Sequence, residues 1–155
     1  MKLILILPAL NEAKVIARVL RQIKLVAAKL PVSTEICVIN DGSGDQTAAI
    51  SKKAGVTVLT HVINRGLGAS LSTGLEYAKR VKADFAITMD SDGQHDPADL
   101  ITVLTPLLNK QTDVVIGSRL LRPTGHMPWL RKINNQAFNL LTRLLFGVVT
   151  TDSLS

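Results

Sequence analysis

The alternation of short apolar runs with longer segments of helical periodicity is the feature that most constrains what this chain can fold into. The apolar runs predict strands at residues 2–7, 35–39, 56–60, 84–89 and 113–116, and the stretches between them predict helices at residues 11–29, 45–54, 67–81 and 97–109. The predicted strands are almost continuously apolar, which is typical of parallel strands buried on both faces. We therefore expect an α/β fold in which helices cover a mostly parallel sheet.

Composition narrows the class of protein further. A chain of 155 residues with 46% apolar and 19% charged residues suits one globular domain and excludes a disordered chain. No apolar run reaches the roughly 18 residues needed to span a bilayer. Residues 1–7 lack a signal-peptide cleavage site, so we interpret them as a strand. The single cysteine, Cys37, is expected to be a small buried apolar residue in a reducing compartment.

The charge balance favours an anionic partner, because the formal net charge is +6. Nucleic acid is disfavoured, since aromatic residues make up only 3% and no helix-turn-helix or zinc-finger spacing occurs. The basic residues concentrate late in the chain, which fits a phosphate-bearing ligand or an anionic membrane surface better than a duplex. Residues 129–149 form a basic segment with apolar residues at helical spacing, a pattern that favours packing on its own domain over lying on a membrane.

Two aspartates, Asp90 and Asp92, follow the apolar run 85–89 at the point where that run stops. This is the carboxyl end of a predicted central strand, where open parallel sheets bind ligands. Because alternate residues of an extended segment face the same way, both carboxylates can approach one cation. Hard oxygen ligands suit Mg²⁺ or Mn²⁺, which carboxylates commonly hold together with substrate phosphates. The alternative is an acidic turn before a helix, which accounts for Asp96 but not for the two earlier aspartates.

Polar loops follow four of the predicted strands, at residues 8–12, 40–47, 64–69 and 90–96. The carboxyl ends of parallel strands meet at one edge of a sheet, so these loops line a single crevice. Each loop also has an ordinary structural explanation. Asn11 and Asp45 would cap helices, and Gly66 with Gly68 would give a helix a tight start. Their occurrence together and in this order favours a ligand site.

Several common nucleotide and hydrolase signatures are absent. The first predicted strand is followed by PALNEA and not by G-x-G-x-x-G, and neither the phosphate loop G-x-x-x-x-G-K-[ST] nor the elbow G-x-S-x-G occurs. The segments PALNEA, NDGSGDQT, NRGLGASLSTGLEYA, MDSDGQHDP and GSR occur in that order. This combination resembles the family-2 glycosyltransferases with the GT-A fold, a three-layer α/β/α Rossmann-like domain. The resemblance covers essentially the whole chain and is strongest to dolichyl- or polyprenyl-phosphate mannose and glucose synthases.

The resemblance implies roles for residues in each loop. Those expected to surround the nucleotide sugar are Pro8, Leu10, Glu12, Asp41, Gly68, Asp90 and Ser91. Asp41 is given the contact to the base, while Asn40 stands where family members usually carry another aspartate. Asp90 and Asp92 match the metal-binding D-x-D, with Gln94 as a further ligand or a partner of a ligand. His95 is interpreted as a hydrogen-bond donor to this loop.

Catalytic roles are implied for Asp92, Arg119 and Arg131, the two arginines as ligands of an acceptor phosphate. Asn135 stands where some members carry serine. A phosphate acceptor is already an anion and attacks without a general base, so positioning by arginine is sufficient. A saccharide hydroxyl would require a carboxylate base, for which Asp152 is a weak candidate.

The implied activity is transfer of a hexose, with inversion, from a UDP- or GDP-sugar to a polyprenyl phosphate, with Mg²⁺ or Mn²⁺ as cofactor. The alternatives are transfer to a saccharide hydroxyl and a nucleotide-sugar-binding module without catalysis. We expect a donor-binding core at residues 1–118, a basic amphipathic segment at 119–155, and a cytoplasmic location at the inner face of the cytoplasmic membrane. Members of this branch continue past Asp152 with a Ser-Gly-Phe-Arg-like segment, so part of the acceptor side is expected to be missing here.

Overall fold

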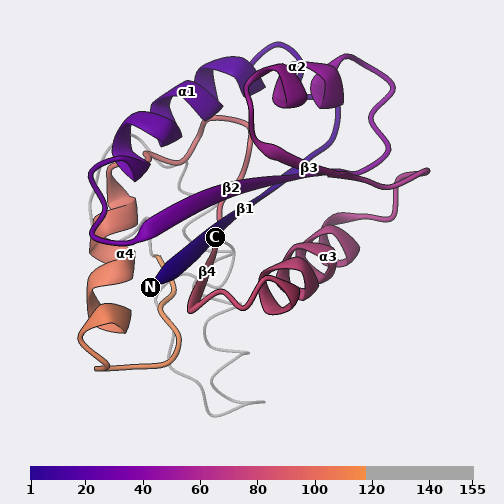
Figure 1. Ribbon diagram of the computed structural model, residues 1–155. Coiled ribbons are helices and arrows are strands. Elements are labelled where there is room, and N and C mark those ends of the chain that lie inside the picture. Colours follow the sequence, from indigo (N-terminus) through magenta and orange to yellow (C-terminus); the bar gives the residue numbers. More distant parts are fainter. Residues whose placement is uncertain (118–155) are drawn as a thin grey trace, which may run out of the picture. The chain divides into compact units, whose positions relative to one another are not determined.

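The computed structural model describes residues 1–117, which contain a four-stranded parallel sheet in the order β3-β2-β1-β4 (Figure 1). The strands are β1 (Lys2–Ala9), β2 (Ser33–Asn40), β3 (Thr57–Thr60) and β4 (Phe85–Thr88). The central strand β1 pairs with β2 along its whole length and with β4 on its other side. The parallel sheet predicted from the continuous apolar runs is confirmed.

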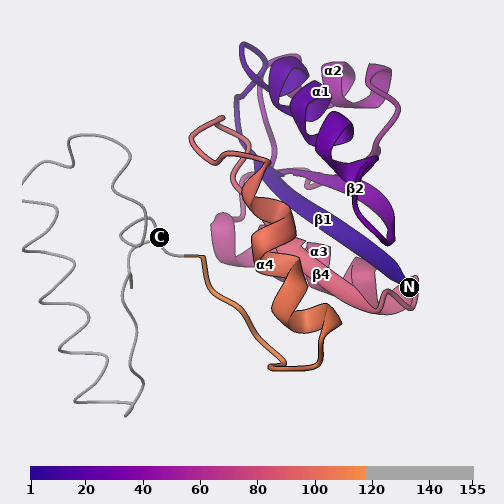
Figure 2. The same ribbon diagram turned by 90° about the vertical axis from the view of Figure 1, so that its left-hand side faces the viewer.

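The helices are α1 (Ile16–Ala27), α2 (Thr47–Lys53), α3 (Leu67–Arg80) and α4 (Asp99–Leu108). Figures 1 and 2 show α1 and α2 on one face of the sheet and α3 on the other, so the expected three layers are present. The apolar face of α1 repeats at helical spacing, and its buried residues are Ile16, Val19, Leu20 and Ile23.

The core between α3 and the sheet is built from alternate residues of the two central strands. Its buried members are Ile4, Ile6, Cys37, Ile39 and Ala78. The thiol of Cys37 is fully buried, as predicted, and burial raises its pKa to about 12. Helix α3 lies so close to β1 at Gly74 that an added Cβ there would be only 2.3 Å from Cγ2 of Ile6. This contact fixes the height of α3 above the sheet.

The chain divides into two compact units, residues 1–101 and 102–155, and α4 runs across the division. The first unit carries all four described strands together with α1, α2 and α3. The division expected from the sequence, between residues 118 and 119, stays a prediction. The basic segment 119–155 lies outside the described residues. Within residues 1–117, no helix is long and apolar enough to cross a bilayer.

Two sequence predictions of secondary structure are wrong. The helix predicted at residues 11–29 begins only at Ile16, because residues 11–15 form a loop that contacts the loop after β2. Residues 113–116 form no strand, and none of the four strands of residues 1–117 pairs with them. Val114 and Ile116, the apolar residues that suggested the strand, are 72% and 67% exposed. The other predicted elements are present, with ends shifted by at most two residues.

Candidate functional site

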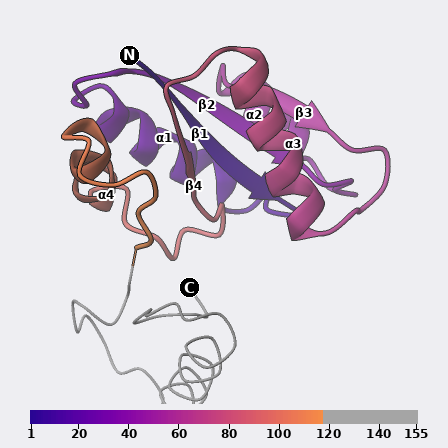
Figure 3. The same ribbon diagram turned by 90° about the horizontal axis from the view of Figure 1, so that it is seen from below.

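The candidate site lies at the carboxyl edge of the sheet. The four strands end at Ala9, Asn40, Thr60 and Thr88, and because all are parallel their following loops leave from the same edge (Figure 3). Hydrogen bonds join the loop after β2 to the loops after β1 and β3, and the loop after β4 to the end of β1. The prediction that the polar loops share one edge is therefore confirmed.

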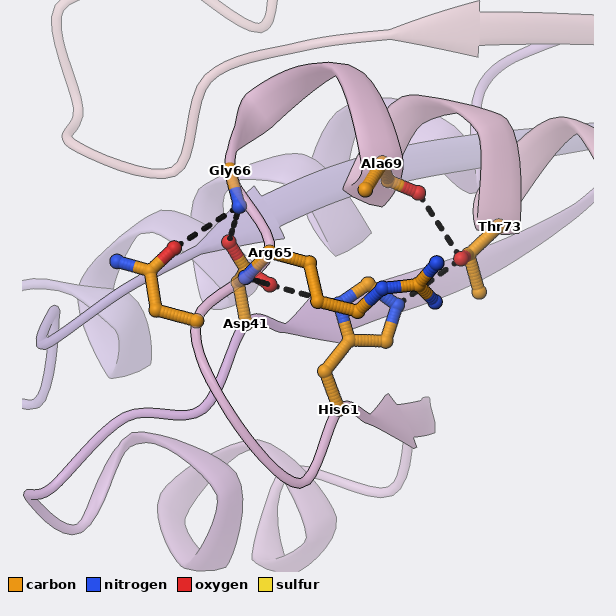
Figure 4. Close-up of polar contacts among 7 residues, drawn as sticks. Asp41, His61, Arg65, Gly66, Ala69 and Thr73 are labelled. Carbon is orange, nitrogen blue, oxygen red and sulfur yellow. Dashed lines mark hydrogen bonds and ion pairs between the residues drawn. The ribbon is translucent and has the colours of Figure 1, made fainter.

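Asp41, the first residue after β2, is buried and organises the loop that follows β3 (Figure 4). Its Oδ1 accepts a hydrogen bond from the backbone N–H of Arg65 at 2.9 Å, and its Oδ2 accepts one from the N–H of Gly66 at 2.8 Å. Burial raises the pKa of Asp41, but the hydrogen bonds from Arg65, His61 and Gly66 outweigh it, so the pKa lies below its ordinary value. Asp41 is thus a buried carboxylate held by donors.

His61, the first residue after β3, is a buried member of this site that sequence reasoning missed. Its Nδ1 lies 2.6 Å from Oδ1 of Asp41 and its Nε2 lies 2.9 Å from Oγ1 of Thr73 on α3 (Figure 4). Its backbone N–H donates to the carbonyl oxygen of Asn40 at 2.9 Å. The only signal in the sequence is its position directly after a predicted strand, which places it at the same edge.

Gly42 allows the backbone of the loop after β3 to pass directly over the loop after β2. Its φ is +70°, and an added Cβ would lie 2.5 Å from both the backbone N of Asn64 and the backbone C of Ile63. No other residue type fits here without moving one of the loops. The side chains of Val62 and Ile63 in the same segment are 97% and 69% exposed.

A second group of contacts joins the loop after β1 to the loop after β2. The backbone N–H groups of residues 11, 12 and 13 each donate to a side chain of the second loop, and the pairs are Asn11–Ser43, Glu12–Thr47 and Ala13–Asp45. In return, Oδ1 of Asn11 accepts from the N–H of Gly44 at 2.9 Å. Asn11, whose φ is +58°, is bonded through both its backbone and its side chain to the loop after β2, so it bridges two loops instead of capping a helix.

The loop that carries the two aspartates is attached to the end of β1 by Ser91, whose hydroxyl donates to the carbonyl oxygen of Pro8 at 2.6 Å. Nε2 of His95 lies 3.0 Å from Oδ2 of Asp90, so the prediction that His95 donates a hydrogen bond to this loop is consistent with its geometry. Oδ1 of Asp92 accepts from the backbone N–H of Gln94 at 2.8 Å. The backbone of this loop and one imidazole thus orient both carboxylates.

Negative charge accumulates where these loops meet. The pKa of Glu12 is raised, first by partial burial and then by the carboxylates of Asp92 and Asp45. A divalent cation relieves this kind of repulsion, and the carboxylates of Asp90 and Asp92 are hard oxygen donors of the type that Mg²⁺ and Mn²⁺ prefer. Residues 1–117 contain no group of three or more His, Cys, Asp or Glu side chains arranged to hold a metal. The donor set fits a cation that takes its remaining ligands from a diphosphate and from water.

The remaining predicted residues fall into two groups. Leu10 lies at the end of β1 with 39% of its surface exposed, and Gly68 lies in the first turn of α3, where an added Cβ would meet nothing within 4 Å. Both are therefore accessible at the same edge. Arg119, Arg131, Asn135 and Asp152 lie outside the described residues. The role given to each site residue in the reaction stays a prediction.

Comparison with known protein families matches residues 4–153 to the glycosyl transferase family 2 model. The chain belongs to glycosyl transferase family 2. It is 40% identical over 156 residues to the uncharacterized protein MJ1222 of Methanocaldococcus jannaschii, covering 99% of this chain and 62% of that protein. It is 34% identical to UDP-N-acetylglucosamine–dolichyl-phosphate N-acetylglucosaminyltransferase of Methanococcus voltae, covering 97% of this chain and 66% of that enzyme.

The chain therefore spans less than two thirds of the length of these family-2 relatives. A further relative, polyprenol monophosphomannose synthase of Mycolicibacterium smegmatis, is 29% identical, with 94% of this chain and 56% of that enzyme covered. The family expected from the five motifs is confirmed, as is its resemblance to polyprenyl-phosphate sugar synthases.

Solved structures confirm the fold. Mannosyl-3-phosphoglycerate synthase of Rubrobacter xylanophilus matches with a TM-score of 0.60 and 22% identity, covering 70% of this chain and 36% of that chain. Glucosyl-3-phosphoglycerate synthase of Mycobacterium tuberculosis, in complex with Mn²⁺ and UDP-glucose, matches with a TM-score of 0.56 and 24% identity, covering 70% of this chain and 39% of that chain. At this identity the likeness concerns the Rossmann-like GT-A fold alone.

Proposed function

We propose that this chain is the donor-binding part of an inverting glycosyltransferase that moves a hexose from a UDP- or GDP-sugar to a polyprenyl phosphate. The observation that carries the proposal is the meeting of the polar loops at one edge of the parallel sheet. There the carboxylates of Glu12 and Asp92 are close enough for their charges to interact, and Asp90 lies in the same loop as Asp92. Relatives that act on dolichyl or polyprenyl phosphates give the acceptor class.

On the donor side, the residues of the loops bind and orient the nucleotide sugar. Pro8, Leu10 and Asp41 surround the base and ribose, while Gly68 leaves open space at the start of α3 for a close approach of the ligand. A Mg²⁺ or Mn²⁺ ion held by Asp90 and Asp92, with Gln94 as a further ligand or a partner of one, supplies the positive charge that a departing diphosphate needs.

On the acceptor side, a phosphate needs no general base, because it is already ionised at neutral pH. Arg119 and Arg131 would bind this phosphate in the bidentate manner that guanidinium groups provide. A polyprenyl phosphate resides in a bilayer, so the protein would work as a peripheral protein at the inner face of the cytoplasmic membrane. The formal net charge of +6 favours such a surface when its lipids are anionic.

The test is a calorimetric titration of UDP-glucose and of GDP-mannose into the protein, each with and without Mn²⁺. We expect one of them to bind, only in the presence of Mn²⁺, and Asp92→Asn to abolish that binding while the circular dichroism spectrum stays unchanged. Glu76→Gln, an exposed carboxylate-to-amide change on α3, is the matched control and should bind as the unsubstituted chain does. Unchanged, Mn²⁺-dependent binding by Asp92→Asn would contradict the metal role.

Transfer is measured separately, with the nucleotide sugar that binds and two kinds of acceptor. Polyprenyl phosphate in detergent should be glycosylated, and a neutral oligosaccharide should not. Transfer to the oligosaccharide alone would replace the proposed acceptor with a saccharide hydroxyl. Binding of the donor without transfer to either acceptor would limit the function of this chain to donor binding.

A further inference from the structure

We infer that His61 is a positioning residue for the donor nucleotide, acting through the carboxylate of Asp41. This inference rests on the proposed function, because it takes Asp41 as the ligand of the base. No motif of the sequence singled out His61, and it reaches the site only because β3 ends beside β2. Its side chain is 7% exposed and that of Asp41 is 6% exposed, so their contact is shielded from water.

The hydrogen bonds of Asp41 divide unequally between its two oxygens. Oδ1 accepts from Nδ1 of His61 at 2.6 Å and from the N–H of Arg65 at 2.9 Å, which occupies both of its lone pairs. Oδ2 accepts from the N–H of Gly66 at 2.8 Å. Among these contacts, one lone pair of Oδ2 remains for an N–H donor such as a nucleobase offers. His61 thereby selects which oxygen is available.

Besides its contact with Asp41, His61 is held by two further contacts. Its backbone N–H donates to the carbonyl oxygen of Asn40 at the end of β2. Its Nε2 lies 2.9 Å from Oγ1 of Thr73, and that hydroxyl donates to the carbonyl oxygen of Ala69 one turn earlier in α3. Since α3 is seated on the sheet through Gly74, the ring links a rigid helix to the carboxylate of Asp41 (Figure 4).

The alternative is that His61 only stabilises the fold, and two substitutions separate the explanations. In His61→Asn the amide nitrogen occupies the position of Nδ1, so the hydrogen bond to Asp41 is kept and the contact with Thr73 is lost. In His61→Gln the amide nitrogen occupies the position of Nε2, so the reverse holds. Each variant loses the ring and retains one contact, which makes the pair matched in stability terms.

The first measurement needs no ligand: amide hydrogen exchange at Arg65 and Gly66, whose N–H groups donate to Asp41. We expect faster exchange in His61→Gln and near-native exchange in His61→Asn, with similar melting temperatures for the two proteins. The difference should be larger at Arg65, because the N–H of Gly66 also donates to Oδ1 of Asn64 at 2.9 Å. Equal exchange at these amides in both variants would overturn the positioning role, since it would show that Asp41 holds its orientation without His61.

The second measurement is the titration of UDP-glucose and GDP-mannose with Mn²⁺. We expect His61→Gln to raise the Kd about tenfold and His61→Asn to leave it within about threefold, because a hydrogen bond to a charged group is at stake. Equal weakening in both variants would assign His61 to the fold alone. If the unsubstituted chain binds neither nucleotide sugar, the proposed function and the donor part of this inference fail together, while the exchange measurement still decides whether His61 positions Asp41.

Discussion

Two polar clusters, one at each end of the sheet, use a buried or half-buried carboxylate in different ways. The carboxyl-edge cluster consists of Asp41, His61, Thr73 and the N–H groups of Arg65 and Gly66. The amino-edge cluster consists of Glu35, Lys2, Thr57 and Tyr77, with Oε1 of Glu35 accepting from both hydroxyls and Oε2 pairing with Lys2 at 2.9 Å.

The difference lies in what each carboxylate holds together. Within residues 1–117, Glu35 on β2 receives hydrogen bonds only from side chains of β1, β3 and α3. The ladders of β2 with β1 and β3, and the packing of α3 on β1 and β2, already hold these elements in place. Asp41 receives two of its hydrogen bonds from the backbone of the irregular loop after β3, which pairs with no strand of residues 1–117. We infer that the amino-edge cluster contributes stability alone, whereas the carboxyl-edge cluster determines the shape of a ligand site.

The largest expected effect comes from substituting Gly42, with Gly55, a glycine of nearly equal φ, as the comparison. Gly42→Ala should destabilise the protein by about 3–5 kcal/mol and abolish donor binding, because its Cβ would collide with the backbone at residues 63 and 64. Gly55→Ala, before β3, has a φ of +68° but its Cβ would meet only Nζ of Lys24 at 3.9 Å. It should cost about 1–2 kcal/mol and leave donor binding intact. Urea unfolding and nucleotide-sugar titration measure both, and equal costs would show that strain and not the collision dominates.

An intermediate effect is expected from removing the charge of each carboxylate. Both oxygens of Asp41 accept from backbone N–H groups, so Asp41→Asn keeps one acceptor but places its NH2 group against an N–H donor. We expect a loss of about 2–4 kcal/mol and weaker nucleotide-sugar binding. In Glu35→Gln the carbonyl oxygen can take the place of Oε1 and keep both hydroxyl donors, and the position is more exposed. A loss of about 1 kcal/mol, from the weakened pairing with Lys2, and unchanged binding are expected. A change of nucleotide-sugar Kd in Glu35→Gln would break the proposed separation between the two clusters.

The carboxyl-edge cluster also shows which features of this molecule can be predicted from the sequence and which cannot. The alternation of apolar runs predicted the parallel sheet, and parallel strands then required their polar loops to share an edge. Which loop residues meet was beyond prediction, because His61 is 20 residues from Asp41 and 12 from Thr73. Other long-range contacts account for the error at residues 11–15. The N–H groups of Asn11 and Glu12 donate to the loop after β2, and these bonds hold the backbone outside the predicted helix.

The smallest expected effect concerns Glu12, whose pKa is raised by burial and by the neighbouring charges of Asp92 and Asp45. A carboxyl whose pKa is raised by folding binds its proton more tightly in the folded protein than in the unfolded chain. The protein therefore loses stability as the pH rises from 4.5, the ordinary pKa of a glutamate, through the raised pKa of Glu12. Glu12→Gln should therefore be more stable than the unsubstituted chain at pH 7, by roughly a few tenths of a kcal/mol. At pH 3 the two proteins should be equally stable. Urea unfolding at both pH values measures the gain, and a gain that persists at pH 3 would assign it to packing. Mn²⁺ at neutral pH should shrink the gain if a cation relieves the same repulsion, which would connect the charge at this edge directly to the carboxylates of Asp90 and Asp92.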